Sequence, residues 1–189
     1  MQNDFLNAVE FSHHLLEKEV EIGDVVLDAT AGNGHDSKFL AELVGEEGKV
    51  YAFDIQQEAL DNTADLLETN SLAKQCKLIK SDHAEIDKYV EEDLDTVIFN
   101  LGYLPGGNKE IITKSESTIT ALKKSLKLLK ETGLVILVIY SGHQGGEKEK
   151  ESILNYSSNL DYKKYNVLNY KFLNQPGPPP EIIAIKKRK

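Results

Sequence analysis

Two short segments of this sequence combine glycines with acidic and amide side chains in a spacing that could support binding and chemistry. The first, "VVLDATAGNGHD", runs from an apolar stretch into a turn with Gly32 and Gly34 and ends at Asp36. Glycines in such a turn let the backbone approach a ligand closely and adopt dihedral angles that a Cβ would penalise. The second, "IFNLGYLPGGNK", passes from another apolar stretch into polar residues at Asn100. The first segment therefore predicts a nucleotide-binding turn, and the second a place where a reaction occurs.

The glycine spacing and the charges of the first segment favour S-adenosylmethionine (SAM) over a dinucleotide. A dinucleotide turn reads G-x-G-x-x-G and directs a helix N-terminus at a pyrophosphate. Here the third glycine is absent, and Asp28 and Asp36 flank the turn. Carboxylates repel a pyrophosphate, whereas they attract the amine and the sulfonium of SAM. We therefore expect SAM as the cofactor; the alternative role for either acid is to cap the following helix.

Two further apolar runs end in polar residues that would complete the cofactor site. Asp54 ends the second run, where its carboxylate can accept hydrogen bonds from both ribose hydroxyls. Asp82 and His83 follow the third run, and we expect Asp82 to accept from the adenine amine while His83 stacks or hydrogen-bonds beside it. Asp82 could instead be a helix N-cap, with Glu85 completing a capping box.

The "NLGY" segment is expected at the acceptor side of the reaction. It resembles the Asn-Pro-Pro-Tyr signature of enzymes that methylate amino groups on bases. Asn100 and a nearby carbonyl can accept hydrogen bonds from an amine and aim its lone pair at the methyl carbon. Tyr103 can stack on a base or close the pocket.

An alkylamine must lose a proton before it can accept a methyl group, so a general base is needed. The candidates are His143 in "SGHQGG", His35 and His83, because the imidazole pKa lies near neutral pH. His13 and His14 are interpreted as surface residues of a leading helix. The histidines and acids are too scattered to give the spacing of a metal site, so no metal is expected.

Alternating strands and helices must position these residues. Strands are predicted at residues 25–29, 50–55, 77–80, 96–99 and 134–140, and helices at 4–19, 36–43, 57–72, 84–90 and 111–130. Near-continuous apolar strands are typical of parallel sheets buried on both faces. After a further helix ending near Asn159, "YKKYNVLNY" and "EIIAIKK" predict an antiparallel hairpin at one edge. The expected fold is α/β, a Rossmann-like class I SAM-dependent methyltransferase fold with a mostly parallel seven-stranded sheet and an antiparallel edge hairpin.

Composition limits the class of protein. The 189 residues are interpreted as a single domain, 1–189, with 40% apolar and 28% charged residues, as in ordinary globular proteins. We expect no membrane segment and no secretory signal, since no apolar run is long enough and the N-terminus carries acids. A single cysteine, Cys76, fits a reducing cytoplasm.

The net charge of −9 argues against indiscriminate nucleic-acid binding. Two basic runs, at residues 122–130 and 186–189, nevertheless leave RNA contact open. The simpler interpretation of both is a solvated helix face and a frayed tail.

Five segments together resemble the YtqB/MnmM family of small bacterial methyltransferases over nearly the whole chain. They are "DATAGNGHDSKFLA", "FDIQQEAL", "NLGYLPGGNK", "SGHQGGEKE" and "NQPGPPPEIIAIKK", in the order of the family. The resemblance implies a SAM-dependent enzyme that converts 5-aminomethyl-2-thiouridine at the tRNA wobble position to its 5-methylaminomethyl form. It also implies a tRNA partner bound by its anticodon region and a homodimer. Asn108 departs from the Asp that relatives often carry, which puts an electrostatic role for that position in doubt.

The resemblance places SAM contacts on Asn33, His35, Asp36, Asp54, Gln56, Asp82 and His83, with "NLGY" at the acceptor side. The full expected cofactor site adds Asp28, Ala29, Gly32, Gly34, Ile55, Asn100 and Leu101, and the expected catalytic residues are Asn100, Tyr103 and His143. Three alternatives stay open: a SAM-dependent methyltransferase acting on rRNA or a small amine, an NAD(P)-dependent reductase, and a non-catalytic RNA-binding module.

Overall fold

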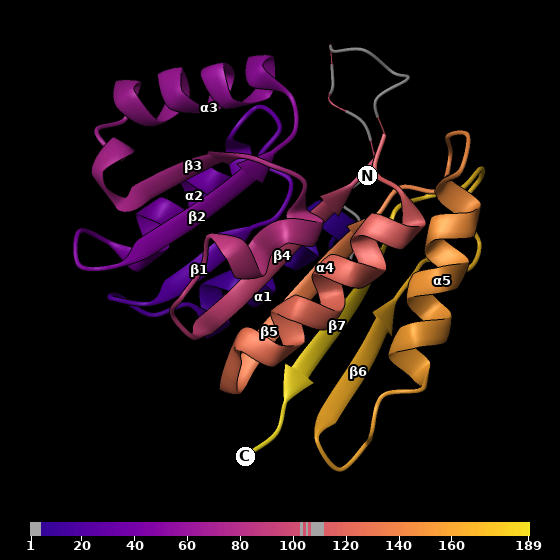
Figure 1. Cartoon of the computed structure of the whole chain (residues 1–189). Helices are drawn as coiled ribbons and strands as arrows, with labels where there is room; N and C mark the ends of the chain where they lie inside the picture. The colour runs from indigo at the N-terminus through magenta and orange to yellow at the C-terminus, as the bar shows by residue number, and fades with distance from the viewer. Residues whose placement is uncertain (1–4, 103, 105, 107–111) are drawn as a thin grey trace.

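A computed structural model describes residues 5–102, 104, 106 and 112–189, which form one seven-stranded sheet covered by helices on both faces (Figure 1). The strands are β1 (Val25–Asp28), β2 (Lys49–Asp54), β3 (Cys76–Lys80), β4 (Leu94–Leu101), β5 (Leu129–Ile139), β6 (Tyr165–Tyr170) and β7 (Glu181–Lys187). The α-helices are α1 (Ala8–Glu19), α2 (His35–Val44), α3 (Gln57–Thr69), α4 (Ser115–Leu128) and α5 (Gly146–Ser158), joined by the 3₁₀ turns η1 (Ala73–Gln75) and η2 (His83–Lys88).

The strand order is β3-β2-β1-β4-β5-β7-β6. β1 to β5 pair in parallel, whereas β7 runs antiparallel to both β5 and β6. The predicted parallel sheet and the predicted antiparallel edge hairpin are therefore both confirmed. Of the residues described, none lies in a helix long and apolar enough to cross a membrane.

The sheet is buried on both faces, which explains the near-continuous apolar runs of its central strands. Val26 and Ile98 point to the face covered by α1, α2 and α3. Their neighbours Leu27 and Phe99 point to the face covered by α4 and α5. Because side chains alternate along a strand, two apolar neighbours in sequence fill two different cores.

Some predicted boundaries differ from the observed ones for local reasons. β5 begins at Leu129 instead of residue 134, because Leu129 pairs with Leu94 before a register shift that precedes Thr96. The predicted helix at 84–90 is the 3₁₀ turn η2, which is kinked at Glu85. These details depend on pairing and on the backbone path, which the apolar pattern does not encode.

The glycine loop after β1 packs tightly on α3, which generates a stability prediction. Gly34 has a φ of 83°, and a Cβ there would lie 2.9 Å from the Cα of Thr63. Gly34→Ala should lower the free energy of unfolding by about 3 kcal/mol or more, because a left-handed backbone and a backbone clash both oppose the side chain. Denaturant unfolding measures this loss.

Gly23→Ala is the matched control. Gly23 has a φ of 90°, but a Cβ there meets nothing within 4 Å. It should lose only about 1 kcal/mol, the backbone part alone. Equal losses in the two variants would contradict a tight loop–helix contact at Gly34.

Candidate active site

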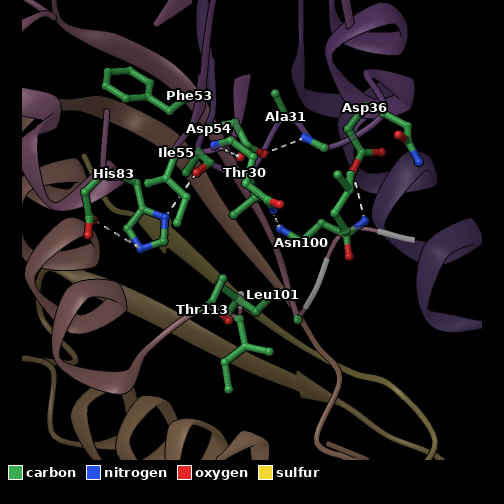
Figure 2. Close-up of a pocket in the computed structure, with 18 of the residues that line it drawn as sticks. Thr30, Ala31, Asp36, Phe53, Asp54, Ile55, His83, Asn100, Leu101 and Thr113 are labelled. Carbon is green, nitrogen blue, oxygen red and sulfur yellow. Dashed lines mark hydrogen bonds and ion pairs between the residues drawn. The ribbon is translucent and has the colours of Figure 1, made fainter. Parts of the chain in front are cut away.

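A cavity of about 620 Å³ opens where the carboxyl ends of β1, β2 and β4 meet the start of η2 (Figure 2). The chain order of the sheet reverses between β1 and β4, and the loops after these strands part to leave a crevice. The expected cofactor residues that line the cavity are Ala29, Gly32, Asn33, His35, Asp36, Asp54, Ile55, Gln56, Asp82, His83, Asn100 and Leu101. The topology thus brings together residues that lie far apart in the sequence.

Asp28 and Gly34 do not line the cavity, although both were expected to contact SAM. Asp28 is fully buried beneath the glycine loop, where its carboxylate accepts hydrogen bonds from the Thr30 N–H (3.0 Å) and the Ser37 hydroxyl (2.6 Å). Gly34 faces Thr63 of α3. Both residues therefore support the loop without lining the cavity. The structure corrects the expectation that they contact the cofactor.

Burial controls the charge of Asp28. Loss of hydration raises its pKa to about 7, and repulsion from the carboxylate of Asp36 adds to the rise. The site therefore keeps this acid protonated over much of the acidic range.

Asp54 connects the loops after β1 and β2. Its two carboxylate oxygens accept from the Gly32 N–H (3.0 Å) and the Gln56 N–H (2.9 Å). Beside it, the apolar side chain of Ile55 is 50% exposed. The cavity wall at this point offers a carboxylate and an apolar surface next to each other.

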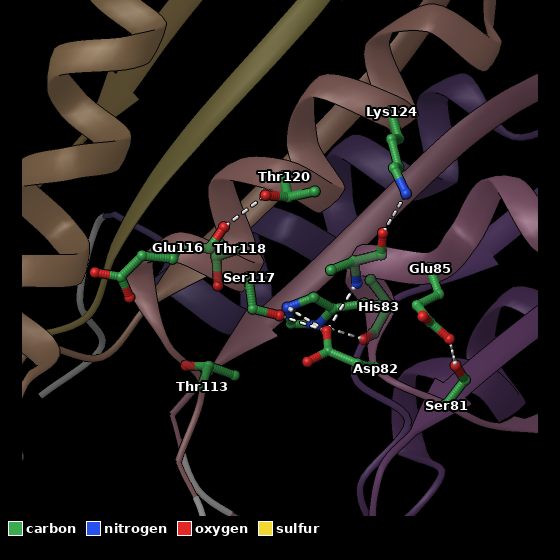
Figure 3. Close-up of polar contacts among 12 residues, drawn as sticks. Ser81, Asp82, His83, Glu85, Thr113, Glu116, Ser117, Thr118, Thr120 and Lys124 are labelled. Carbon is green, nitrogen blue, oxygen red and sulfur yellow. Dashed lines mark hydrogen bonds and ion pairs between the residues drawn. The ribbon is translucent and has the colours of Figure 1, made fainter.

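Asp82 is held in place from two sides (Figure 3). It accepts from the Ala84 N–H at 2.8 Å, as an N-cap of η2, and from the hydroxyl of Ser117 on α4. Burial would raise the pKa of Asp82, but these hydrogen bonds outweigh burial and lower it. The expected N-cap is present without the capping box, because the Glu85 carboxylate accepts from Ser81 and Lys88 instead.

His83 presents a hydrogen-bond acceptor at the cavity wall. Its Nδ1 lies 3.1 Å from the carbonyl oxygen of Ala29, so Nδ1 carries the proton of the neutral ring. Burial lowers the pKa of His83, which keeps the ring neutral. Among the described residues its buried Nε2 has no hydrogen-bond partner. A ligand donor would satisfy this atom.

Asn100 joins the glycine loop to the acceptor side. Its backbone N–H donates to the Thr30 hydroxyl at 2.7 Å, and its Nδ2 donates to Asp36 Oδ2 at 3.1 Å (Figure 2). The second expected residue of this motif, Tyr103, lies outside the described residues, as does Asn108.

Asp36 makes a second contact that the sequence did not indicate. His13 of α1 places its Nε2 2.8 Å from Asp36 Oδ1, and its ring stacks on Phe39 with a centroid distance of 4.2 Å. His13 and His14 are both half-buried, so they lie at the surface as expected but are not fully exposed. The two carboxylate oxygens of Asp36 contact side chains of α1 and β4, and neither contact caps α2.

The three candidate bases lie in different surroundings. His35 and His83 line the cavity, whereas His143, in the loop before α5, is half-buried and outside the lining. The ring of His143 instead lies over Gly146 and close to the carbonyl of Gln144. The role of His143 as catalytic base stays a prediction, and its position outside the cavity lining does not support it.

Comparisons with known proteins agree with this geometry. Residues 50–186 match the model of a family described as "Putative rRNA methylase". A crystal structure of a protein so described from Clostridium thermocellum is 43% identical, covering 98% of this chain and 100% of that one, with a TM-score of 0.96. The chain belongs to this methylase family.

Two further relatives of the methylase are informative. A Streptococcus mutans methyltransferase, solved in complex with S-adenosylhomocysteine (SAH), is 39% identical over 97% of this chain and 99% of that one, with a TM-score of 0.90. The chloroplastic tRNA (mnm5s2U34)-methyltransferase of Arabidopsis thaliana is 40% identical over 95% of this chain and 69% of that protein. The expected class I fold, the methyltransferase class and SAM as cofactor are thereby confirmed.

Several residues that line the cavity of this methylase are not among the expected site residues. They are Thr30, Thr113, Lys114, Ser117 and Tyr140. Tyr140 follows β5 directly, so the rule that strand ends form the site would have found it. Thr113 and Ser117 carry no such signal, because their position depends on how α4 packs against η2.

The raised pKa of Asp28 predicts how the stability of this methylase depends on pH. The folded pKa of about 7 exceeds the ordinary value of 3.8, so the unfolded chain loses this proton first as pH rises. The contribution of Asp28 should therefore fall between about pH 4 and pH 7, by about 4 kcal/mol. In Asp28→Asn this part of the slope should disappear in urea unfolding measured across that range.

The exposed acid Glu47 provides the control for this measurement. Glu47→Gln should leave the slope unchanged. An Asp28→Asn protein with the wild-type slope would show that Asp28 is ionised in the fold.

Proposed function

We propose that this methylase transfers a methyl group from SAM to the aminomethyl nitrogen of 5-aminomethyl-2-thiouridine at the wobble position of tRNA. The observation that carries the proposal is the 40% identity with the Arabidopsis tRNA (mnm5s2U34)-methyltransferase over 95% of this chain. The name of that relative specifies a tRNA position and a methylaminomethyl product. Residues at the cavity wall meet the demands of such a reaction, first for SAM and then for the amine.

The cavity fits SAM in its donor and acceptor groups. Asp54 offers carboxylate oxygens to the ribose hydroxyls, and Ile55 offers an apolar surface to the adenine ring. The buried Nε2 of His83 can accept from the adenine amine. Among the described residues, Asp36 forms no ion pair with a lysine or arginine, which suits a cationic ligand. When bound, SAM supplies an electrophilic methyl group on its sulfonium.

Asn100 is placed to orient the acceptor amine. Because its Nδ2 donates to Asp36, its Oδ1 is left to accept an N–H of the substrate. The bond from its own backbone N–H to Thr30 fixes this orientation relative to the glycine loop. Holding the amine and the methyl group in line is where much of the rate in such a transfer originates.

The RNA must approach the edge of the sheet that carries the cavity. At that edge lie Lys114, which lines the cavity, Lys148 in the first turns of α5, and Lys171 directly after β6. These lysines can neutralise phosphates of the RNA backbone, although the net charge of the chain is −9. Lys148 pairs with Glu116 and Lys171 with Glu181, so the RNA phosphates would compete with these two acids.

The two basic runs singled out in the sequence lie elsewhere. α4 runs away from the cavity toward the start of β5, and β7 ends beside Leu134, at the opposite edge of the sheet (Figure 1). Lys124 and Lys130 pair with Asp87 and Asp95, and Lys186 pairs with Glu19. Because both runs lie away from the cavity, their structural interpretation is favoured over RNA contact.

An rRNA substrate is the alternative with a specific observation behind it. Ribosomal RNA small subunit methyltransferase H of Streptococcus equi is 25% identical over 54% of this chain and 34% of that protein. This match covers about half of the chain, whereas the match to the tRNA enzyme covers nearly all of it. The tRNA proposal is preferred on that ground.

Mass spectrometry of wobble nucleosides tests the proposal. Incubation of the protein and SAM with tRNA that carries 5-aminomethyl-2-thiouridine should add one methyl group to that nucleoside. Asn100→Ala should lower kcat by about 100-fold, because the amine loses its orienting acceptor.

The same assay separates the alternatives. Lys127→Ala, on α4 away from the cavity, is the control and should retain full activity. Methylation of rRNA but not of the aminomethyl nucleoside would reject the tRNA proposal, and tight NADH binding without SAM binding would reject the methyltransferase.

Assembly and location stay predictions. A homodimer would be tested by the mass of the protein in solution, and a cytoplasmic location by fractionation. The half-buried Cys76, whose thiol pKa is raised by burial to about 12, fits a packing role in either case.

A further inference from the structure

One carboxylate connects the acceptor motif with the outer surface of α1. Asp36 Oδ2 accepts from Asn100 Nδ2 at 3.1 Å, while Asp36 Oδ1 lies 2.8 Å from His13 Nε2. The side chain of Asp36 is 10% exposed and that of His13 is 30% exposed. Asp36 and Asn100 line the cavity, and His13 does not. A titratable pair therefore bridges the wall between the cavity and solvent.

The proposed reaction requires a route of this kind. A primary alkylamine has a pKa near that of lysine, about 10.4, so it arrives as an ammonium without a lone pair. The amide of Asn100 can orient the nitrogen but has no basic site at neutral pH. The Asp36 carboxylate, whose Oδ2 lies 3.1 Å from Asn100 Nδ2, can take a proton.

We propose that Asp36 and His13 form the path by which the proton leaves the acceptor ammonium and reaches water. This inference rests on the proposed function and adds to it the residue that discharges the proton. An N–H bond of the ammonium breaks as the proton moves to the Asp36 carboxylate. His13, in its Nδ1–H tautomer, takes that proton at Nε2 and releases the Nδ1 proton to water, and exchange with water restores the tautomer.

The charge balance closes with this one proton. The amine lone pair forms the N–C bond as the C–S bond breaks, so the product is a secondary ammonium and a neutral thioether. One proton enters solution in each turnover. His13 acts through Asp36 and is a positioning and proton-carrying residue that does not touch substrate.

Other titratable groups face Asp36 and bear on its behaviour. Asp28 of β1 lies beneath it, and Tyr140 follows β5; charge on Asp36 contributes to raising the pKa of each. Phe39 of α2 holds the ring of His13 by stacking at 4.2 Å. The imidazole is thus fixed in orientation while its outer edge can exchange protons with solvent.

A pH series on His13→Gln tests the path. Gln keeps a polar group near Asp36 but cannot carry a proton, so kcat at pH 7 should fall by about 100-fold. The defect should shrink toward pH 10, where the amine is deprotonated without help. Asp36→Asn approaches the same pair from its other side and should show the same pH dependence.

A second measurement does not depend on turnover. Calorimetric titration with SAH measures the cofactor site directly, and the Kd for SAH should be the same in wild-type protein and in His13→Gln. His14→Gln, the half-buried neighbour on the same helix, is the control and should match wild type in both assays.

Three outcomes would decide against the inference. A loss of kcat in His13→Gln that is the same at every pH would show that His13 only supports the fold. A parallel weakening of SAH binding in His13→Gln would show that His13 serves the cofactor site. Failure of the wild-type protein to methylate aminomethyl tRNA would reject the proposed function, and the proton path with it, before any variant is compared.

Discussion

The site depends on a buried carboxylate that does not line the cavity. Asp28 ends β1 with no exposure to solvent and accepts hydrogen bonds from the Thr30 N–H and the Ser37 hydroxyl. These bonds tie both ends of the glycine loop to the strand from which it leaves. Removing an acid from water is costly, and the protein limits that cost by a raised pKa and by a hydrogen bond to each carboxylate oxygen. The loop can then turn its glycine backbone toward the cavity.

From this anchor the two halves of the site follow. The Gly32 N–H donates a hydrogen bond to the Asp54 carboxylate, which fixes the cofactor side. The Asn100 N–H donates one to the Thr30 hydroxyl, which fixes the acceptor side. One loop therefore sets the distance between the two groups that must meet in the reaction. The relative positions of these residues are fixed because they lie at rigid strand ends, on both sides of the reversal in strand order.

Much of the fold could be predicted because its signals are local. The apolar runs that became β1, β2 and β4 are long and continuous, and the hairpin of β6 and β7 is separated by a proline-rich turn. Most of the expected cofactor residues line the cavity, since strand ends in a parallel sheet converge whatever their side chains are. The start of β5 and the 3₁₀ form of η2 were missed, because both depend on pairing and packing with distant residues.

The sequence by itself determined the cofactor chemistry and the acceptor motif: two glycines without a third, acids around them, and "NLGY" after a buried strand. These are short-range patterns, in which residue type and spacing carry the chemistry. Only the tertiary structure decided which role each of these acids has. It buried Asp28 under the loop, left Asp54 at the cavity wall, and brought His13 from another helix to Asp36. No pattern along the chain encodes these distinctions, because exposure and partner choice are set when α1, α2 and β4 pack together.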